Sequence, residues 1–187
     1  MDGAFDLMAT MRIQKVSITL TAAAAGLLLA GCSGGSSAPE GNPPSSEATN
    51  VLQNFDPCTV LTPEEIQSFG ASPEGEPSDL GLGETGCDFD GEVFDFGILK
   101  APESDQAYWE GQKNNFDRFE PNQVGSHAGF SGISTGGAGQ GVCSQMMYVG
   151  SGTVTVDVTY RSDTMAGADP CAKAMEIAQA VEPKLPQ

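Results

Sequence analysis

TVTVDVTY, residues 153–160, alternates apolar and polar side chains at every second position. Successive side chains of a strand point to opposite faces, so we expect the three valines and Tyr160 to face a core, and the threonines and Asp157 to face outward. An antiparallel sheet with one covered face requires this alternation. Residues 142–149 precede the run across Gly150-Ser151-Gly152, and the two segments are expected to form a hairpin.

A second hairpin is predicted earlier in the chain. Residues 87–89 and 93–99 flank Asp90-Gly91, a residue pair that favours hairpin turns. One further short strand is expected at 128–133, inside the glycine-rich stretch 125–141. These segments together predict a sheet of about five strands.

The clearest helix start lies at Thr62. This residue is placed to act as N-cap, Pro63 fits the first helical position, and Glu65 completes a capping box. Gly70 is expected to end the helix. Residues 71–85 are polar and rich in Gly and Pro, and they are expected to form a loop.

Two more helices are predicted downstream. Ser104 is placed to cap one that runs to about Phe116, and Asp169-Pro170 opens the last one. The buried stripe of the last helix is expected to consist of Cys171, Ala174, Met175, Ala178 and Val181. The order of elements predicts a single α+β domain, an antiparallel sheet with two to three packed helices.

Composition narrows the choice of partners. The 187 residues include 8 Lys+Arg against 25 Asp+Glu, which gives a net charge of −17. A nucleic-acid backbone and an anionic lipid surface both attract proteins rich in Lys and Arg, so neither is an expected direct partner. The length suits one compact domain with a sizeable core.

The N-terminus has the form of a lipoprotein signal peptide. Arg12 and Lys15 precede an apolar run over 16–29, which is too short to span a bilayer as a helix. The run ends at Leu29-Ala30-Gly31-Cys32, where small residues precede a cysteine whose thiol would carry a diacylglyceryl group, with fatty acids such as palmitate as the anchor. The alternative is an ordinary signal peptide with an incidental cysteine. The first ten residues carry two acids and no base, so Met11 is the expected start.

Three segments are therefore predicted. Residues 1–31 form a removable signal peptide, residues 32–54 a flexible linker rich in Gly, Ser and Pro, and residues 55–187 the globular domain. Acylation at Cys32 would hold the exported domain on the outer face of the cytoplasmic membrane.

Four cysteines remain once Cys32 is acylated. An even count in an exported chain predicts two disulfides, for which three pairings exist. We favour Cys58–Cys171 and Cys87–Cys143. Cys58 and Cys171 each follow Asp-Pro at an expected helix start, whereas Cys87 and Cys143 lie in expected strands. The chain has no C-x-x-C pair and its sole histidine is remote in sequence, so no metal site is expected.

Candidate reactive groups are few. His127 follows Ser126, but neighbours in an extended segment point to opposite sides, so no nucleophile–base pair is expected. The glycine run 137–141 lacks the lysine and the spacing of a phosphate loop. The acidic residues of 88–92 and Asp95 lack a full set of calcium ligands and are interpreted as turn and strand-edge residues. No catalytic residue and no cofactor is predicted.

The main aromatic cluster is formed by Tyr108, Trp109, Phe116 and Phe119. One side of the segment that carries it is expected to pack on the sheet. An exposed Trp109 would instead indicate a contact surface for a partner or a hydrophobic ligand.

Short motifs mark the cysteines and the termini of the predicted domain: Asp56-Pro57-Cys58, Leu61-Thr62-Pro63-Glu64-Glu65, Gly86-Cys87, Gly141-Val142-Cys143, Asp169-Pro170-Cys171 with Ala174, and Lys184-Leu185-Pro186. In this order they resemble a family of actinobacterial lipoproteins built on one domain of unknown function. The resemblance covers about residues 55–186, with Phe89 in the place of a tryptophan that is more usual after the second cysteine. It implies a protein of the cell envelope, and one member of the family is an accessory regulator of an envelope-stress system. No catalytic residue follows from it.

Three functions are compatible with these features. The leading hypothesis is a non-catalytic, lipid-anchored lipoprotein that acts as an interaction or sensing module in the cell envelope, with an envelope protein as partner. The alternative is a carrier for a small apolar or lipidic ligand, which needs a pocket of several hundred Å³ lined by Phe, Met and Val. The third is an envelope enzyme that uses His127 or paired carboxylates as acid–base groups.

Overall fold

The computed structural model describes residues 50–81 and 83–187. The predicted signal peptide, the acylation site Cys32 and residues 32–49 of the predicted linker lie outside the described residues. Within the described ranges, none of the helices combines the length and the apolar character that crossing a membrane requires.

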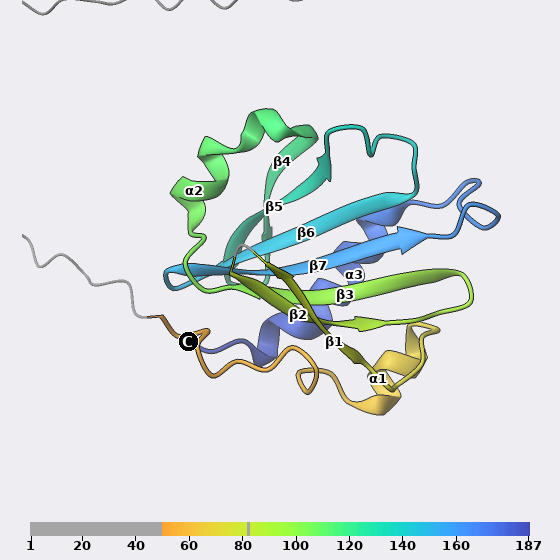
Figure 1. Ribbon diagram of the computed structural model, residues 1–187, viewed down its shortest axis with the longest axis horizontal. Coiled ribbons are helices and arrows are strands. Elements are labelled where there is room, and N and C mark those ends of the chain that lie inside the picture. The colour runs from red at the N-terminus through yellow and green to blue at the C-terminus, as the bar shows by residue number, and fades with distance from the viewer. Residues whose placement is uncertain (1–49, 82) are drawn as a thin grey trace, which may run out of the picture. The chain divides into compact units, whose positions relative to one another are not determined.

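The described residues build one antiparallel sheet of seven strands, accompanied by three α-helices (Figure 1). The strands are β1 (Glu76–Gly81), β2 (Glu84–Phe89), β3 (Phe94–Ala101), β4 (Phe116–Val124), β5 (His127–Ser134), β6 (Val142–Val149) and β7 (Gly152–Tyr160). The helices are α1 (Pro63–Ser68), α2 (Gln106–Gly111) and α3 (Pro170–Val181), with the 3-10 turns η1 (Lys113–Asn115) and η2 (Glu182–Lys184).

The strand order is β1-β2-β3-β7-β6-β5-β4. Two meanders, β1 to β3 and β4 to β7, therefore join where β3 pairs with β7 in the middle of the sheet. The connection between the meanders runs through α2, and α3 returns behind the sheet (Figure 1). We refer to the two surfaces of the sheet as the α2 face and the α3 face.

The main hydrophobic core lies on the α3 face. The valines of β7 that the alternation assigns to a core, 154, 156 and 158, are at most 1 % exposed. They belong to the same buried cluster as Ala174 and Ile177 of α3. The predicted buried stripe of α3 is confirmed except at Met175, which is only half-buried. Ile177, which the prediction did not include, is fully buried.

Local signals place the first and last helices correctly. Thr62 Oγ1 accepts from Glu65 N (3.3 Å) and Glu65 Oε2 accepts from Thr62 N (2.8 Å), which is the predicted capping box. At the start of α3, Asp169 Oδ1 accepts from Ala172 N at 3.0 Å. The predicted middle helix is shorter than expected, because Asp105 rather than Ser104 caps it and Phe116 already begins β4.

The expectation of five strands is wrong because both edge strands were missed. β1 lies in the predicted loop 71–85, and β4 follows directly where the second helix was expected to end. An edge strand buries little surface, so its sequence need not alternate. β1 is almost wholly exposed, and the two edges contain Pro77 and Pro121, residues that argue against a central strand.

The α2 face is also covered in part, which corrects the expectation of a single covered face. Thr153 and Thr155 of β7 are buried although the alternation assigns them to the outside. Trp109 Nε1 donates to Thr153 Oγ1 at 3.0 Å, so α2 lies against this face. The predicted packing of the aromatic cluster on the sheet is confirmed, because the ring centroids of Trp109 on α2 and Phe130 on β5 are 6.0 Å apart.

The expectation of two disulfides is confirmed, but the favoured pairing is wrong. The bonds are Cys58–Cys87 and Cys143–Cys171, not Cys58–Cys171 and Cys87–Cys143. β3 and β7 lie between β2 and β6, so Cys87 and Cys143 are three strand spacings apart, about 14 Å. That separation is about twice the Cα distance that a disulfide can bridge.

Candidate functional site

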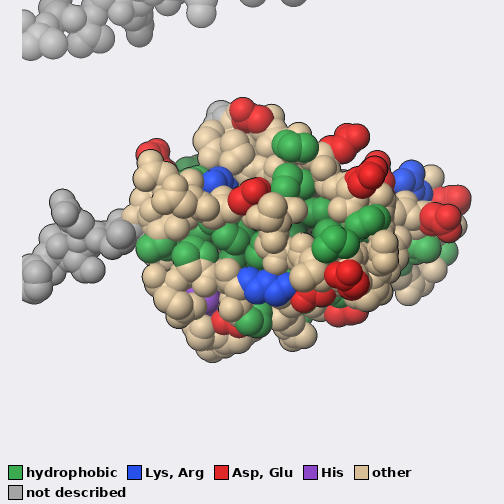
Figure 2. Space-filling model, turned by 90° about the horizontal axis from the view of Figure 1, so that it is seen from below, with side chains coloured by type: hydrophobic (Ala, Val, Ile, Leu, Met, Phe, Trp, Pro, Cys, Tyr) green, Lys and Arg blue, Asp and Glu red, His purple; other side chains and the backbone are tan. Residues whose placement is uncertain are grey.

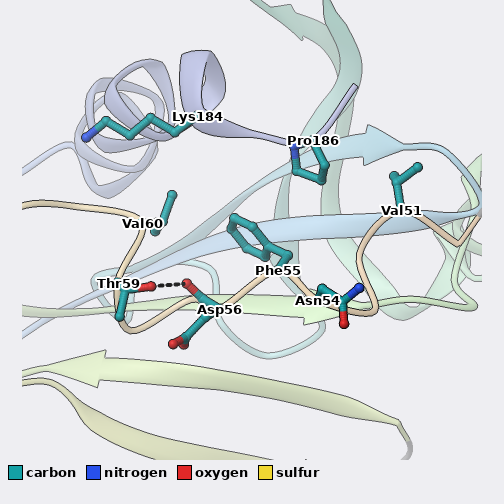
Figure 3. Close-up of a pocket in the computed structure, with 8 residues that line it drawn as sticks. All are labelled: Val51, Asn54, Phe55, Asp56, Thr59, Val60, Lys184 and Pro186. Carbon is teal, nitrogen blue, oxygen red and sulfur yellow. Dashed lines mark hydrogen bonds between the residues drawn. The ribbon is translucent and has the colours of Figure 1, made fainter.

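A hollow at the end where the described chain begins lies between residues 51–60 and the C-terminal residues (Figure 3). We call it the end hollow, and its volume is about 440 Å³. Its lining residues are Val51, Asn54, Phe55, Asp56, Thr59, Val60, Lys184 and Pro186. The ring of Phe55 lies between Val60 and Pro186 in the close-up, so the floor is apolar and the rim is polar (Figure 3).

Several contacts fix the segment that forms this hollow. Lys100 Nζ, from β3, donates to the backbone carbonyls of Gln53 and Phe55. Asp56 Oδ1 accepts from Cys58 N at 3.0 Å, and Cys58 is bonded to Cys87 of β2. A disulfide and the contacts of the half-buried Lys100 hold one short segment, so the hollow is a preformed surface.

The chemistry of the end hollow is that of a binding surface. The hydroxyl of Thr59 donates to the backbone carbonyl of Asp56 (3.4 Å) rather than to a base. Lys184 Nζ pairs with Glu65, and this contact is the main reason why the pKa of Glu65 lies below its usual value. A second hollow of about 550 Å³ shares Asn54, Phe55 and Asp56 with the first and extends over Pro77 and Thr85.

The molecular surface on the side of α1 and residues 51–60 carries both hydrophobic and acidic side chains. In Figure 2 the molecule is seen from below, the side on which α1 and residues 51–60 lie in Figure 1. Hydrophobic side chains form a band there, with acidic side chains around it (Figure 2). The surface is therefore amphipathic and acidic, in keeping with the net charge of −17.

A second candidate site lies on the α2 face, and we call it the sheet cleft. Its volume is about 160 Å³, and it is lined by Glu84, Leu99, Trp109, Phe116, Ser134, Ser144, Met146, Thr155 and Asp157. A neighbouring depression of about 180 Å³ shares Ser134, Ser144 and Asp157. These three side chains therefore lie where the two depressions meet.

The register of the strands explains why there is space above Asp157. Asp157 of β7 pairs with Gly97 of β3 on one side and with Ser144 of β6 on the other. Ser144 in turn pairs with Gly132 of β5, so a glycine stands on each side of the Asp157–Ser144 pair. A Cβ atom at Gly97 would meet Asp88 Oδ1 at 2.7 Å, and one at Gly132 would meet the ring of Phe116 at 3.1 Å. The two glycines therefore leave room for the Asp88 carboxyl and the Phe116 ring to lie close to the Asp157–Ser144 pair.

The floor of the sheet cleft is electrostatically unusual. Burial raises the pKa of Asp157 to about 6, a hydrogen bond from Ser144 acts in the opposite direction, and the nearby charges of Glu84 and Asp88 raise it further. Burial also raises the pKa of Glu84. The alternation of residues 153–160 assigned Asp157 to solvent, so sequence reasoning missed this site. The flanking glycines become a signal only once the register of the strands is known.

His127 and Ser126 do meet, contrary to the sequence expectation. Residues 125–126 form the turn between β4 and β5, so the two side chains are not in one extended segment. Ser126 Oγ donates to Glu182 Oε1 (2.8 Å), and His127 Nδ1 lies 3.0 Å from the same oxygen. The carboxylate and the hydroxyl both face Nδ1, whereas a catalytic triad uses the two ring nitrogens separately.

The Ser126–His127–Glu182 cluster ties the β4–β5 turn to the end of α3. The backbone N–H and hydroxyl of Ser126, followed by His127, lower the pKa of Glu182. His127 points to the α3 side of the sheet, where Glu182 follows α3, whereas the carboxyls of the sheet cleft lie on the α2 face. The hypothesis of an envelope enzyme offered His127 or paired carboxylates as the acid–base groups. The fold does not bring His127 and the carboxyls of the sheet cleft into one cleft.

The remaining sequence candidates have structural contacts. Asp117 Oδ2 accepts from Gly136 N (2.8 Å) and Ala138 N (3.3 Å), so the glycine loop holds a carboxylate of the chain itself. Asp95 Oδ1 accepts from Gly91 N (3.0 Å) and pairs with Arg161 (2.9 Å), which fixes the β2–β3 turn. Among residues 50–81 and 83–187, no three metal-ligating side chains gather in one place.

Fold and sites together define a mostly sheet domain, braced by two disulfides, with hollows at one end and on the α2 face. The chain belongs to the family described as protein of unknown function (DUF3558), which it matches over residues 27–184. Neither a curated protein nor a solved structure matches it.

Proposed function

We propose that the protein is a lipid-anchored module of the cell envelope that binds an envelope protein without catalysing a reaction. The end hollow carries this proposal, because it is an apolar floor with a polar rim on a disulfide-fixed segment. Binding surfaces gain affinity from being preformed, since less ordering accompanies association. The domain continues there from the predicted linker, so the surface would lie at the tethered end of the domain.

Charge determines which partner fits. The chain has a net charge of −17, and Asp56 lies on the rim of the hollow. The complementary partner is a basic segment of an envelope protein with at least one apolar side chain for the floor, because complementary charge speeds association and orients it. If such binding reports on the state of the envelope, the sensing role implied by the family resemblance would follow from it.

A carrier of an apolar ligand is less well supported. Its pocket would lie between the sheet and α3, where Phe96, Val156 and Ile177 are all at most 2 % exposed and belong to one packed cluster. The geometry therefore favours a ligand bound on the surface.

The anchor gives the first test. In the full chain, Cys32→Ala is expected to abolish incorporation of labelled palmitate and to move the protein from the membrane fraction to the soluble fraction. The physical reason is that each buried CH₂ of an acyl chain contributes about 0.8 kcal/mol to membrane binding. Cys32→Ala leaves the four disulfide cysteines intact, so folding serves as its internal control. Unchanged fractionation of the variant would exclude the anchor.

The binding surface gives the second test. A photo-crosslinking amino acid at Thr59, on the exposed rim, is expected to yield one discrete adduct in living cells, which Asn54→Arg abolishes. The same amino acid at Gln179, which is exposed on α3, is the matched control and should give none. The adduct should contain a basic envelope protein that binds the purified full chain with an affinity that falls as salt rises. Equal adducts from both positions, or an adduct insensitive to Asn54→Arg, would refute the surface.

A further inference from the structure

We propose that the sheet cleft binds a small organic cation, an ammonium group with a short apolar part. This site is separate from the end hollow, since the two share no lining residue. Three features of the cleft determine the class of ligand: its uncompensated negative charge, its aromatic wall and its size.

The negative charge of the cleft has no partner in the chain. None of the ion pairs formed by residues 50–81 and 83–187 includes Glu84, Asp88 or Asp157. Asp157 Oδ1 accepts from Ser144 Oγ, while no described group donates to Oδ2. Asp157 is half-buried, and a carboxylate drawn partly out of water favours a positively charged partner, so the site is complementary to a cation.

An aromatic wall stands over this charge. Trp109 and Phe116 line the cleft, and their ring centroids are 6.2 Å apart in an edge-to-face arrangement. The hydrogen bond from Trp109 Nε1 to Thr153 Oγ1 fixes the orientation of the indole. Aromatic faces attract cations, and Trp is the most effective of them. Leu99 and Met146 complete the wall with apolar surface.

Size and donor set favour an organic cation over a bare metal ion. No three metal-ligating side chains gather among the described residues, so the carboxyls do not converge on one point. The volume of about 160 Å³ instead fits a cation whose charge is spread over several atoms. Ammonium groups of free amines and of lipid headgroups share this chemistry.

The test uses Trp109, which is the sole tryptophan of the chain and therefore reports from the wall of the cleft. The full chain in a maltoside detergent, which carries no ammonium group, is titrated with choline. The matched probe is 3,3-dimethylbutan-1-ol, in which carbon replaces the charged nitrogen. We expect choline to change the fluorescence saturably and to bind at least tenfold more tightly than the neutral isostere.

Variants separate charge from packing. Asp157→Asn is expected to weaken choline binding at least tenfold, and Asp163→Asn, an exposed change of the same charge, is expected to leave it unchanged. Glu84→Gln should weaken it about threefold, which tests the charge of the cleft at a second position. Vesicles of phosphatidylcholine and of phosphatidylglycerol then show whether a headgroup can supply the cation. Equal binding of choline and its isostere, wild-type affinity in Asp157→Asn, or no saturable signal would overturn the proposal.

Discussion

Replacing the Cys143–Cys171 disulfide in the double variant Cys143→Ala/Cys171→Ala should lower the free energy of unfolding by roughly 3.5 kcal/mol. The bond joins β6 to the first turn of α3 across 28 positions of sequence, a span that includes all of β7. Breaking it enlarges the ensemble of unfolded conformations, while the native contacts of α3 with β6 and β7 persist. Urea unfolding, monitored by the fluorescence of Trp109, measures the change.

The pairing itself can be tested with free-thiol titration. Cys58→Ala/Cys87→Ala removes one native bond and should add no free thiol to those of the wild type, because Cys143 and Cys171 stay bonded. Cys58→Ala/Cys171→Ala should add two free thiols, because β3 and β7 separate Cys87 from Cys143. If the second variant gained no titratable thiols, the pairing described above would be incorrect.

Asp157→Asn should stabilise the protein at pH 7.5 by up to about 3 kcal/mol, since a pKa raised from 3.8 to about 6 corresponds to that free energy. The folded state holds the proton of Asp157 more tightly than the unfolded state does. Between pH 3.8 and 6 the folded state therefore binds more protons, and this group makes the protein less stable as the pH rises. Asparagine has no such titration and can still accept the hydrogen bond of Ser144.

The pH dependence distinguishes this effect from a change in packing. The difference in unfolding free energy between Asp157→Asn and wild type should be near zero at pH 3.5 and should reach its full value above pH 6. Asp163→Asn, made in an exposed loop, should show no comparable rise. A difference that stays constant across this range would mean that burial does not raise the pKa of Asp157.

Elements that depend on neighbouring residues could be predicted from sequence. The capping box of Thr62 and Glu65, and the hairpin around Asp90-Gly91, require only contacts within a few positions, and the structure confirms them. The disulfide pairing and the edge strands depend on the order in which strands assemble. Nothing in the local sequence of Cys87 shows that β3 and β7 intervene before Cys143.

The sheet cleft likewise could not be predicted from local sequence, because it depends on how distant segments come together. Alternation assigns Asp157 to the side of β7 away from the valines, and that assignment is correct. It cannot show that the connection through α2 crosses that side and brings Trp109 over it. Gly97 and Gly132 are recognisable as neighbours of Asp157 only once the register of four strands is known.

The prolines of the two edge strands affect how copies of the protein can associate edge to edge. Pro77 in β1 and Pro121 in β4 each lack an N–H group, so both rims of the sheet have a gap in their row of donors. A neighbouring copy that approached either rim could not continue the ladder without interruption. Many copies confined at high density would therefore remain separate bodies instead of fusing into fibrils.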